Sequence, residues 1–306
     1  MSTSSYLSMM TIPSSFADRI IHMRGKTGEL WLNSIFDTIR ICEERWNLKV
    51  SEPFELSFNY VVKTIDAKVV IKVGLPGGEY QAELNALRYY NGIGLCRLID
   101  TIEERNVLLL ESLDPGTSLT DLNEDMAIRA ACFVIREMQS VSKKIEKSFP
   151  TISDWANALE GIPANSLPNS VAMDSDLIKR VQDYCRDLQA TQKNVYLLHG
   201  DLHHGNILAH GKLWKAIDPK GIVGETEFEL APFLLNNVAH ESMETVIEYR
   251  VFQFSRELNI NPDRVYGWGL FRAMLAVWWN IEDNQSASDL DLALLQFFNK
   301  KSRAFM

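Results

Sequence analysis

A helical pattern of hydrophobic residues opens the chain. Over about residues 14–46, apolar positions recur near helical spacing with charged residues between them, and they include Leu30, Ile35, Ile39 and Trp46. Residues three or four positions apart lie on the same face of a helix. The pattern therefore predicts a helical segment that buries one face, and we expect Leu30 and Ile35 to belong to that face.

A different texture follows from residue 47 to residue 78. This stretch is rich in β-branched and aromatic residues, and turn residues at 52–53, 66–67 and 76–78 interrupt it. Such segments are typical of antiparallel strands. Residues 79–90 then return to helical spacing, with Tyr80, Leu84, Leu87 and Tyr90 on neighbouring faces. Residues 96–113 predict two more strands.

From residue 115 onward the pattern is helical almost throughout. Three apolar stripes carry it: Ile128, Cys132, Ile135, Met138 and Val141; Leu177, Val181, Tyr184 and Leu188; Ile247, Val251, Phe254 and Leu258. Asn261 before Pro262 and Ser288 near the end are expected helix caps. The sequence therefore predicts an α+β fold with two lobes. An antiparallel-sheet lobe with helices covers residues 1–112, and a mainly helical lobe covers residues 113–306.

Composition and charge narrow the classes of partner. Hydrophobic residues make up 46% of the 306 residues, which is typical of a globular protein. The net charge of −9, without a basic stripe, argues against nucleic acid and favours a cationic small molecule. The four cysteines are widely spread, as in a reducing cytosol. No leader or membrane span is recognised, so we expect a cytoplasmic protein; nothing indicates its oligomeric state.

Polar and titratable residues crowd into residues 197–221, "LLHGDLHHGNILAHGKLWKAIDPKG". The apolar runs around them predict a hairpin, with Asp201 before its first strand and Asp218 after its second. The two carboxylates and the carboxamide of Asn206 can then converge, and glycines 200, 205 and 221 allow tight turns. These are hard oxygen donors, which suit Mg²⁺ that also binds phosphates. One carboxylate remains free to accept a proton.

The spacing in this stretch matches the requirements of phosphoryl transfer. Asp201 and Asn206 are five residues apart. Kinase catalytic loops have the same offset between the aspartate that orients the attacking hydroxyl and the asparagine that binds metal. Such a site also needs a lysine on an upstream strand, and "KVVIKVG" supplies Lys72. The following helix offers Glu83 as the first choice of partner for this lysine and Glu79 as the second.

These motifs resemble the aminoglycoside phosphotransferase branch of the protein-kinase-like fold, and specifically its streptomycin 6-kinase and hydroxyurea kinase group. The segments "HGDLHHGNIL", "IDPKG", "LSFNYV" and "LLLESLDPGTSL" carry the resemblance, which spans nearly the whole chain. It implies an enzyme that uses ATP and Mg²⁺ to phosphorylate a hydroxyl group of a small molecule, with an aminoglycoside such as streptomycin as the expected acceptor.

The resemblance also implies roles for individual residues. Asp201 would be the catalytic base, and Asn206 and Asp218 would be the metal ligands. Lys72 would bind the α- and β-phosphates, with Glu83 as its partner. Main-chain groups from Glu111 to Leu113 would contact the adenine. The segment before Lys72 lacks a G-x-G-x-x-G motif. Phosphate contacts there would come from Ser57, Phe58 and Asn59. His199 is expected to brace the loop rather than react.

The acceptor side is less specified. Carboxylates pair with ammonium and guanidinium groups, so Glu225, Glu282 and Asp283 are candidate acceptor-binding residues. Glu229 is an alternative that could instead brace the catalytic loop. Trp278 and Trp279 are expected to form the core and rim of a helix, although adjacent tryptophans could also floor a sugar pocket.

Three other functions remain open from the sequence. One is a metabolic kinase that acts on hydroxyurea-like, choline-like or sugar acceptors. Another is a metal hydrolase, in which His199, His203 and His204 would bind zinc. The third is a nucleotide-binding module without catalysis, which the intact pair of Asp201 and Asp218 disfavours. The sequence does not decide between ATP and GTP.

Overall fold

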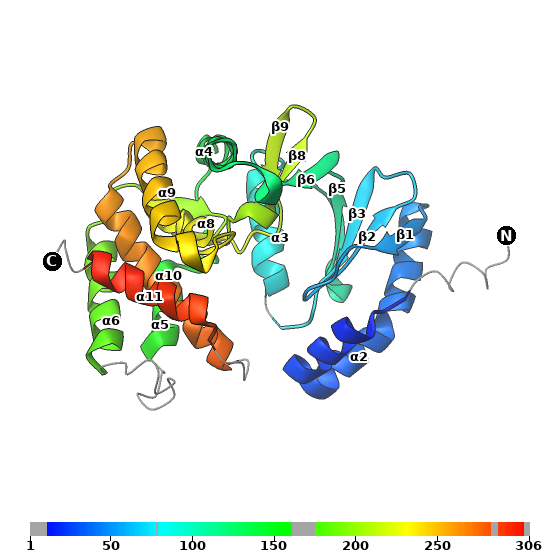
Figure 1. The fold of residues 1–306 in the computed structure, drawn as a ribbon. Coiled ribbons are helices and arrows are strands. Elements are labelled where there is room, and N and C mark those ends of the chain that lie inside the picture. The colour runs from blue at the N-terminus through cyan, green and yellow to red at the C-terminus, as the bar shows by residue number, and fades with distance from the viewer. Residues whose placement is uncertain (1–10, 78, 161–174, 283–286, 303–306) are drawn as a thin grey trace. The chain divides into compact units, whose positions relative to one another are not determined.

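The computed structural model describes residues 11–77, 79–160, 175–282 and 287–302. The chain divides into two compact units, Met1–Gly116 and Thr117–Met306 (Figure 1). The boundary that the sequence suggested falls after residue 112. Within the described ranges, no helix has both the length and the apolar character needed to cross a membrane.

Unit 1 is built on a five-stranded antiparallel sheet with the strand order β1-β2-β3-β5-β4. Its strands are β1 (Val50–Pro53), β2 (Tyr60–Thr64), β3 (Val69–Val73), β4 (Leu98–Ile102) and β5 (Val107–Glu111). Two α-helices, α2 (Ser14–Trp46) and α3 (Glu79–Tyr90), and a short 3₁₀ turn, η2 (Glu103–Arg105), complete its described part. The predicted strands and both predicted helices are therefore present.

The core of unit 1 lies between α2 and the sheet. Apolar residues from both form one buried cluster that includes Phe16, Ile20, Trp31, Ile35, Ile39, Tyr60, Val62, Ile71 and Val107. Leu30 was predicted to share this face, and that prediction is wrong because Leu30 is 60% exposed. Trp31, Ile35 and Ile39 are four residues apart and lie on the core side of the helix. Leu30 precedes Trp31 by one position, and one position along a helix rotates a side chain by about 100°.

Unit 2 is mainly helical. Its α-helices are α4 (Glu124–Gln139), α5 (Ile152–Glu160), α6 (Ser175–Ala190), α7 (Thr226–Glu229), α8 (Ala231–Leu235), α9 (Met243–Leu258), α10 (Pro262–Glu282) and α11 (Asp289–Ser302). Short 3₁₀ turns are η3 (Leu119–Asp121), η4 (His204–Asn206) and η5 (His240–Ser242). β6 (Pro115–Ser118) spans the boundary between the units. β7 (Tyr196–Leu198) pairs with β10 (Ile222–Gly224), and β8 (Ile207–His210) pairs with β9 (Leu213–Ala216).

Helix α10 is the central packing element of unit 2, since it contacts α6, α7, α8, α9 and α11. Its start is the predicted one: Oδ1 of Asn261 accepts a hydrogen bond from the N–H of Asp263 at 2.9 Å. The predicted cap of α11 is also present, because Oγ of Ser288 accepts from the N–H of Asp291 at 3.1 Å. These caps satisfy backbone donors that the first turn leaves unpaired.

Candidate active site

The candidate site is built around residues 199–206, which connect β7 to β8 and are called the 199–206 loop below. The backbone of Ile217, at the end of the β8–β9 hairpin, ties the two ends of this loop together. Its N–H donates to the carbonyl of Asn206 at 2.9 Å, and its carbonyl oxygen lies 2.7 Å from Nε2 of His199. Because Asp218 follows Ile217 directly, this backbone arrangement brings Asp218 next to the loop.

His199 braces the loop, as predicted. Its side chain is fully buried, and Nδ1 accepts a hydrogen bond from the N–H of Asp201 at 3.2 Å. The other ring nitrogen then carries the proton that it donates to Ile217. Burial lowers the pKa of His199 to about 4, so the ring is neutral at physiological pH. With both nitrogens occupied, His199 fixes the backbone of Asp201.

Glu229, at the end of α7, holds the same loop from the other side. Its Oε2 accepts a hydrogen bond from the N–H of His199 at 2.6 Å, and its Oε1 accepts from the N–H of Gly200 at 2.9 Å. Burial raises the pKa of Glu229 to about 7. Glu229 therefore braces the loop, which was the alternative that the sequence offered for it.

Asp201 presents its two carboxylate oxygens to different surroundings. Oδ1 accepts a hydrogen bond from Nη2 of Arg272, in α10, at 2.9 Å. Oδ2 lies 4.0 Å from Nε2 of His203, and no hydrogen bond from the described part of the chain reaches it. Burial acts to raise the pKa of Asp201, but the positive charges around it, Arg272 foremost, hold that pKa below its usual value. Asp201 is thus a carboxylate with one oxygen available.

Asn206 and Asp218 are oxygen donors that fit a magnesium ion. Nδ2 of Asn206 donates to the backbone carbonyl of Asp201 at 2.9 Å, so the amide nitrogen faces the loop and its role as a metal ligand, through Oδ1, stays a prediction. Burial lowers the pKa of His203, and the charges of Asp201 and Asp218 partly offset that effect. Both carboxylates therefore act on the same ring. Hard oxygen donors of this kind match Mg²⁺.

In unit 1 the predicted lysine–glutamate pair is present. Nζ of Lys72, on β3, lies 2.8 Å from Oε1 of Glu83, on α3. The side chains are buried, with exposed fractions of 4% and 9%. A buried pair needs close geometry to offset the desolvation of two charges. The prediction of Glu83 as a partner of Lys72 is confirmed, while the contact of Lys72 with a nucleotide stays a prediction.

The other predicted nucleotide contacts lie at the margins of the sheet of unit 1. Ser57 is exposed between β1 and β2, and Oδ1 of Asn59 accepts a hydrogen bond from the N–H of Leu75 at 3.0 Å. Oε2 of Glu111 accepts from the N–H of Arg97 at 2.9 Å, and Leu113 is buried. These contacts hold the backbone around the predicted positions, and the roles of these residues toward a nucleotide stay predictions.

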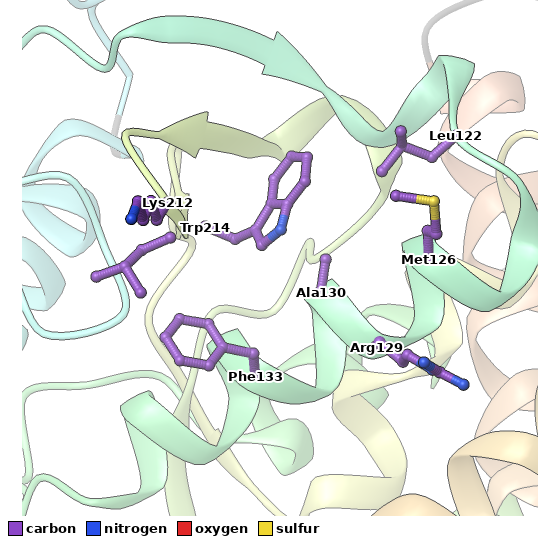
Figure 2. Close-up of a pocket in the computed structure, with 8 residues that line it drawn as sticks. Leu122, Met126, Arg129, Ala130, Phe133, Lys212 and Trp214 are labelled. Atoms are coloured by element: carbon purple, nitrogen blue, oxygen red, sulfur yellow. The ribbon is translucent and has the colours of Figure 1, made fainter.

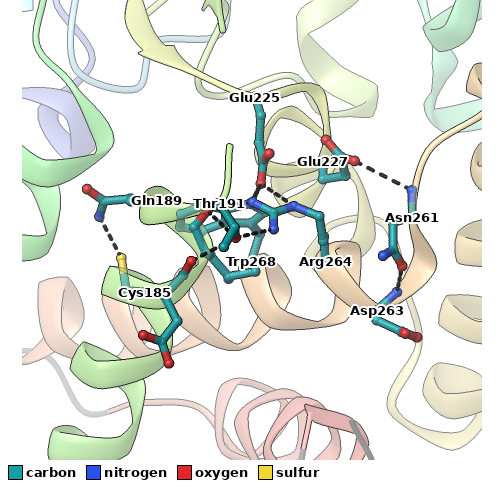
Figure 3. A network of polar contacts seen from close by, with 11 residues as sticks. Cys185, Gln189, Thr191, Glu225, Glu227, Asn261, Asp263, Arg264 and Trp268 are labelled. Atoms are coloured by element: carbon teal, nitrogen blue, oxygen red, sulfur yellow. Dashed lines mark hydrogen bonds and ion pairs between the residues drawn. The ribbon is translucent and has the colours of Figure 1, made fainter. Parts of the chain in front are cut away.

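Glu225, a predicted acceptor-binding residue, is engaged inside unit 2. It is 4% exposed, and its Oε1 accepts hydrogen bonds from Nε of Arg264 at 2.9 Å and from Nε1 of Trp268 (Figure 3). It also lines a polar cavity of about 620 Å³, together with Glu227 and Arg264. Asp283 and the side chain of Glu282 lie outside the described residues, so both stay predictions from the sequence.

A second cavity in unit 2, of about 420 Å³, lies between α4 and the β8–β9 hairpin (Figure 2). Its lining is mostly apolar and includes Met126, Phe133 and Trp214, with Arg129 and Lys212 as the charged members. No carboxylate is among the described residues that line this cavity, so its described lining lacks the groups that pair with a cationic acceptor. Asp201 lines neither of the two cavities.

The three histidines of the loop serve separate partners. His204 is buried and stacks on Phe233 with ring centroids 3.8 Å apart, while Nδ1 of His203 accepts from the N–H of Gly205 at 3.1 Å. Within the part of the chain that the structure describes, no three His, Cys, Asp or Glu side chains gather as metal ligands. The histidine cluster that suggested zinc is therefore a set of structural contacts.

One residue of the site was missed by sequence reasoning. Arg272 contacts Asp201 from 71 positions away, so no local spacing reveals the pair. A signal was nevertheless present, because Arg272 interrupts the apolar stretch "FRAMLAVWW". A charged residue in the middle of a buried stretch requires a buried partner.

Comparisons with known proteins agree with this geometry. Residues 57–284 match the family model described as aminoglycoside/hydroxyurea antibiotic resistance kinase. The chain is 29% identical to a streptomycin 6-kinase of Streptomyces glaucescens, over 92% of this chain and 94% of that protein. It is 27% identical to a hydroxyurea phosphotransferase of Kitasatospora aureofaciens, over 91% and 83%.

Among solved structures, a choline kinase from Streptococcus pneumoniae matches with a TM-score of 0.66 at 14% identity, over 88% of this chain and 99% of that one. This match confirms the predicted kinase-like α+β fold. The family match covers most of the chain and includes the 199–206 loop, Asp218 and Lys72. The chain is therefore a phosphotransferase with a hydroxyl group as acceptor, and it belongs to the aminoglycoside/hydroxyurea antibiotic resistance kinase family.

Proposed function

We propose that this chain transfers the γ-phosphoryl group of ATP to a hydroxyl group of an aminoglycoside, with streptomycin as the first acceptor to test. The observation that carries the proposal is the state of Asp201, whose Oδ1 is held by Arg272 while Oδ2 accepts no hydrogen bond from the described residues. The similarity to a streptomycin 6-kinase supports the acceptor class. The net charge of −9 also favours a cationic acceptor.

In the proposed reaction, the acceptor hydroxyl donates a hydrogen bond to Oδ2 of Asp201. The hydroxyl oxygen forms a bond to the γ-phosphorus, and the bond between that phosphorus and the β–γ bridging oxygen breaks. ADP leaves with the bridging oxygen, and the hydroxyl proton passes to Asp201. The carboxylate thus orients the acceptor and receives its proton, which are the two tasks that phosphoryl transfer requires of it.

Other residues would bind the nucleotide and the metal. Asn206 and Asp218 would hold Mg²⁺, which neutralises negative charge on the phosphate oxygens when bound. Lys72, oriented by Glu83, would bind the α- and β-phosphates. Ser57 and Asn59 would contribute further phosphate contacts, and main-chain groups from Glu111 to Leu113 would meet the adenine. Because Arg264 and Trp268 occupy Oε1 of Glu225, we assign Glu225 to the packing of α10.

The test of Asp201 is its replacement by asparagine, which keeps the shape and removes the charge. We expect Asp201→Asn to lower kcat at least about 10²-fold, because the acceptor proton loses its recipient. Affinity for ATP should stay within about twofold, since the change does not touch the proposed nucleotide contacts. Streptomycin-dependent ADP release measures the first, and calorimetric titration with ATP the second. Full turnover by the variant removes Asp201 from its role.

A second candidate acceptor is hydroxyurea, which the similarity to a hydroxyurea phosphotransferase favours. The two acceptors are distinguished by incubating the purified protein with ATP and Mg²⁺ and with each compound in turn. Choline and simple sugars serve as metabolic alternatives in the same panel. We expect a phosphorylated streptomycin product by mass spectrometry. Transfer to hydroxyurea alone would support the second candidate. Competition of GTP with ATP in the same assay would define the phosphoryl donor.

A further inference from the structure

Arg272 has an unusual environment for a charged residue. It lies in the apolar half of α10, its side chain is 12% exposed, and its hydrogen bond from Nη2 to Oδ1 of Asp201 is 2.9 Å long. Its Nη1 is buried and has no hydrogen-bond partner among the described residues. Leaving a donor of a buried charged group unpaired is unfavourable, because the group loses its hydration without gaining a hydrogen bond. This guanidinium therefore needs stabilisation beyond its one hydrogen bond to Asp201.

Two tryptophan rings supply that stabilisation. The guanidinium carbon of Arg272 lies 4.6 Å from the ring centroid of Trp279 and 5.6 Å from that of Trp155. The two rings contact each other edge to face, with centroids 5.7 Å apart. The negative face of an indole attracts a cation, and more strongly when water is excluded. Trp155 in turn packs on Phe228 of α7, with ring centroids 5.9 Å apart.

This support connects Arg272 to the elements that hold the 199–206 loop. Phe228 and Glu229 are neighbours on α7, and Glu229 fixes the backbone of His199 and Gly200. One part of α7 therefore supports the loop backbone, while the other supports a tryptophan that packs on Arg272. The carboxylate of Asp201 is therefore positioned both by the loop backbone, which Glu229 holds, and by Arg272.

Arg264, on the same helix, shows what a packing arginine looks like here. It donates to Glu225 and to Oγ1 of Thr191 (Figure 3), and also to the carbonyl of Leu188. Since Leu188 and Thr191 both lie at the end of α6, these hydrogen bonds join α10 to two other segments. Arg272 instead donates to Asp201 alone among the described residues. Its single hydrogen bond goes to the residue proposed to receive the acceptor proton.

We propose that Arg272 is a positioning residue for the transfer reaction, held by Trp155 and Trp279 so that it fixes Oδ1 of Asp201 and leaves Oδ2 to the acceptor hydroxyl. The inference rests on the proposed function of Asp201. It adds a requirement for a planar cation in an aromatic-walled site beside the carboxylate. A guanidinium meets this requirement better than an ammonium, because it is planar and weakly hydrated.

The test is chemical rescue. Arg272→Ala should lower kcat by about 10²-fold, with the KM for ATP unchanged, because a misplaced base disturbs only the transfer step. Free guanidinium chloride, below denaturing concentration, should restore part of that loss by entering the vacated space between the tryptophans. Urea has nearly the same shape without the charge, and it should restore nothing. Arg272→Lys should retain the charge and recover only a fraction of the wild-type rate.

Matched variants separate positioning from packing. Arg264→Ala removes an arginine of the same helix and should lower the melting temperature while leaving the kcat of the folded protein within about twofold. Trp279→Leu should lower kcat without touching Asp201, whereas Trp278→Leu should mainly lower stability. These two variants keep the test usable even when Arg272→Ala fails to fold.

The outcomes are distinguishable from those of the proposed function. Normal kcat in Arg272→Ala, or equal rescue by urea and guanidinium, overturns the positioning role while an inactive Asp201→Asn leaves the proposed function intact. Equal losses of kcat in Arg272→Ala and Arg264→Ala assign both residues to packing and also overturn the proposal. If Asp201→Asn itself turns over normally, the proposed function fails first.

Discussion

At the residue scale, two carboxylates of the site have pKa values shifted in opposite directions: Asp201, within the 199–206 loop, and Glu229, which binds the backbone of that loop. Glu229 is buried among neutral N–H donors, so desolvation dominates and its pKa rises to about 7. Asp201 has Arg272 against one oxygen, and the positive charges near it overcome the effect of burial and lower its pKa. A lowered pKa keeps Asp201 ionised, as a proton acceptor must be, and the surroundings rather than the residue type decide the difference.

This difference predicts how stability depends on pH. The native pKa of Glu229 is about 7 against an ordinary value of 4.5, so the native state binds more protons than the unfolded state between these values. The contribution of Glu229 to the free energy of unfolding is fully present below pH 4.5. It is lost as the pH rises from 4.5 through 7, a decrease on the order of 3 kcal/mol. Urea unfolding from pH 5 to pH 9 measures this loss.

Glu229→Gln is the matched variant for that measurement. The amide has the same shape but does not ionise, so the decrease in stability between about pH 4.5 and pH 7 should largely disappear. The variant should also lower activity, since a single amide oxygen replaces the two carboxylate oxygens that accept from His199 and Gly200. An unchanged pH slope in Glu229→Gln would show that another group causes it.

At the element scale, the 199–206 loop depends on backbone conformations that a side chain would disturb. Gly200 has φ 82°, and a Cβ built on it would lie 2.7 Å from Cγ2 of Ile222 on β10. Gly221 also has a positive φ, 63°, and tight turns were predicted at glycines 200, 205 and 221. Gly205 differs, since it lies in η4 without a positive φ. A sequence marks a glycine but not whether its conformation or its lack of volume is needed.

Gly200→Ala should therefore be severely destabilising. The added methyl group meets both an unfavourable φ and a buried side chain, so we expect a loss of more than about 2 kcal/mol and a strong decrease in kcat. Gly211→Ala is the control, since Gly211 has φ 59° but no atom within 4 Å of the built Cβ. That change should lose only about 1 kcal/mol. Equal effects on urea unfolding would contradict the steric explanation.

At the scale of the whole molecule, what the sequence could predict depends on the separation of the contacting residues. The pair of Asp201 and Asn206 spans five positions and Lys72 and Glu83 span eleven, so local spacing and one strand–helix connection suffice to suggest them. Arg272 and Asp201 span 71 positions, and their contact depends on how α10 packs in unit 2. Leu30 shows the same limit, since periodicity alone did not fix which helix face is buried.

The two units should also separate experimentally by function. Lys72→Met removes the proposed phosphate ligand from unit 1 and leaves Glu83 buried without its lysine, so ATP should bind at least about tenfold more weakly. Lys63→Met, on the neighbouring strand β2, is the matched control and should leave ATP affinity unchanged. Asp201→Asn in unit 2 should show the reverse behaviour, with ATP bound and transfer lost. Calorimetric titration and single-turnover transfer on the three variants measure this. Equal loss of ATP affinity in the Lys63 and Lys72 variants would show that the strand, rather than the ammonium group of Lys72, supports nucleotide binding.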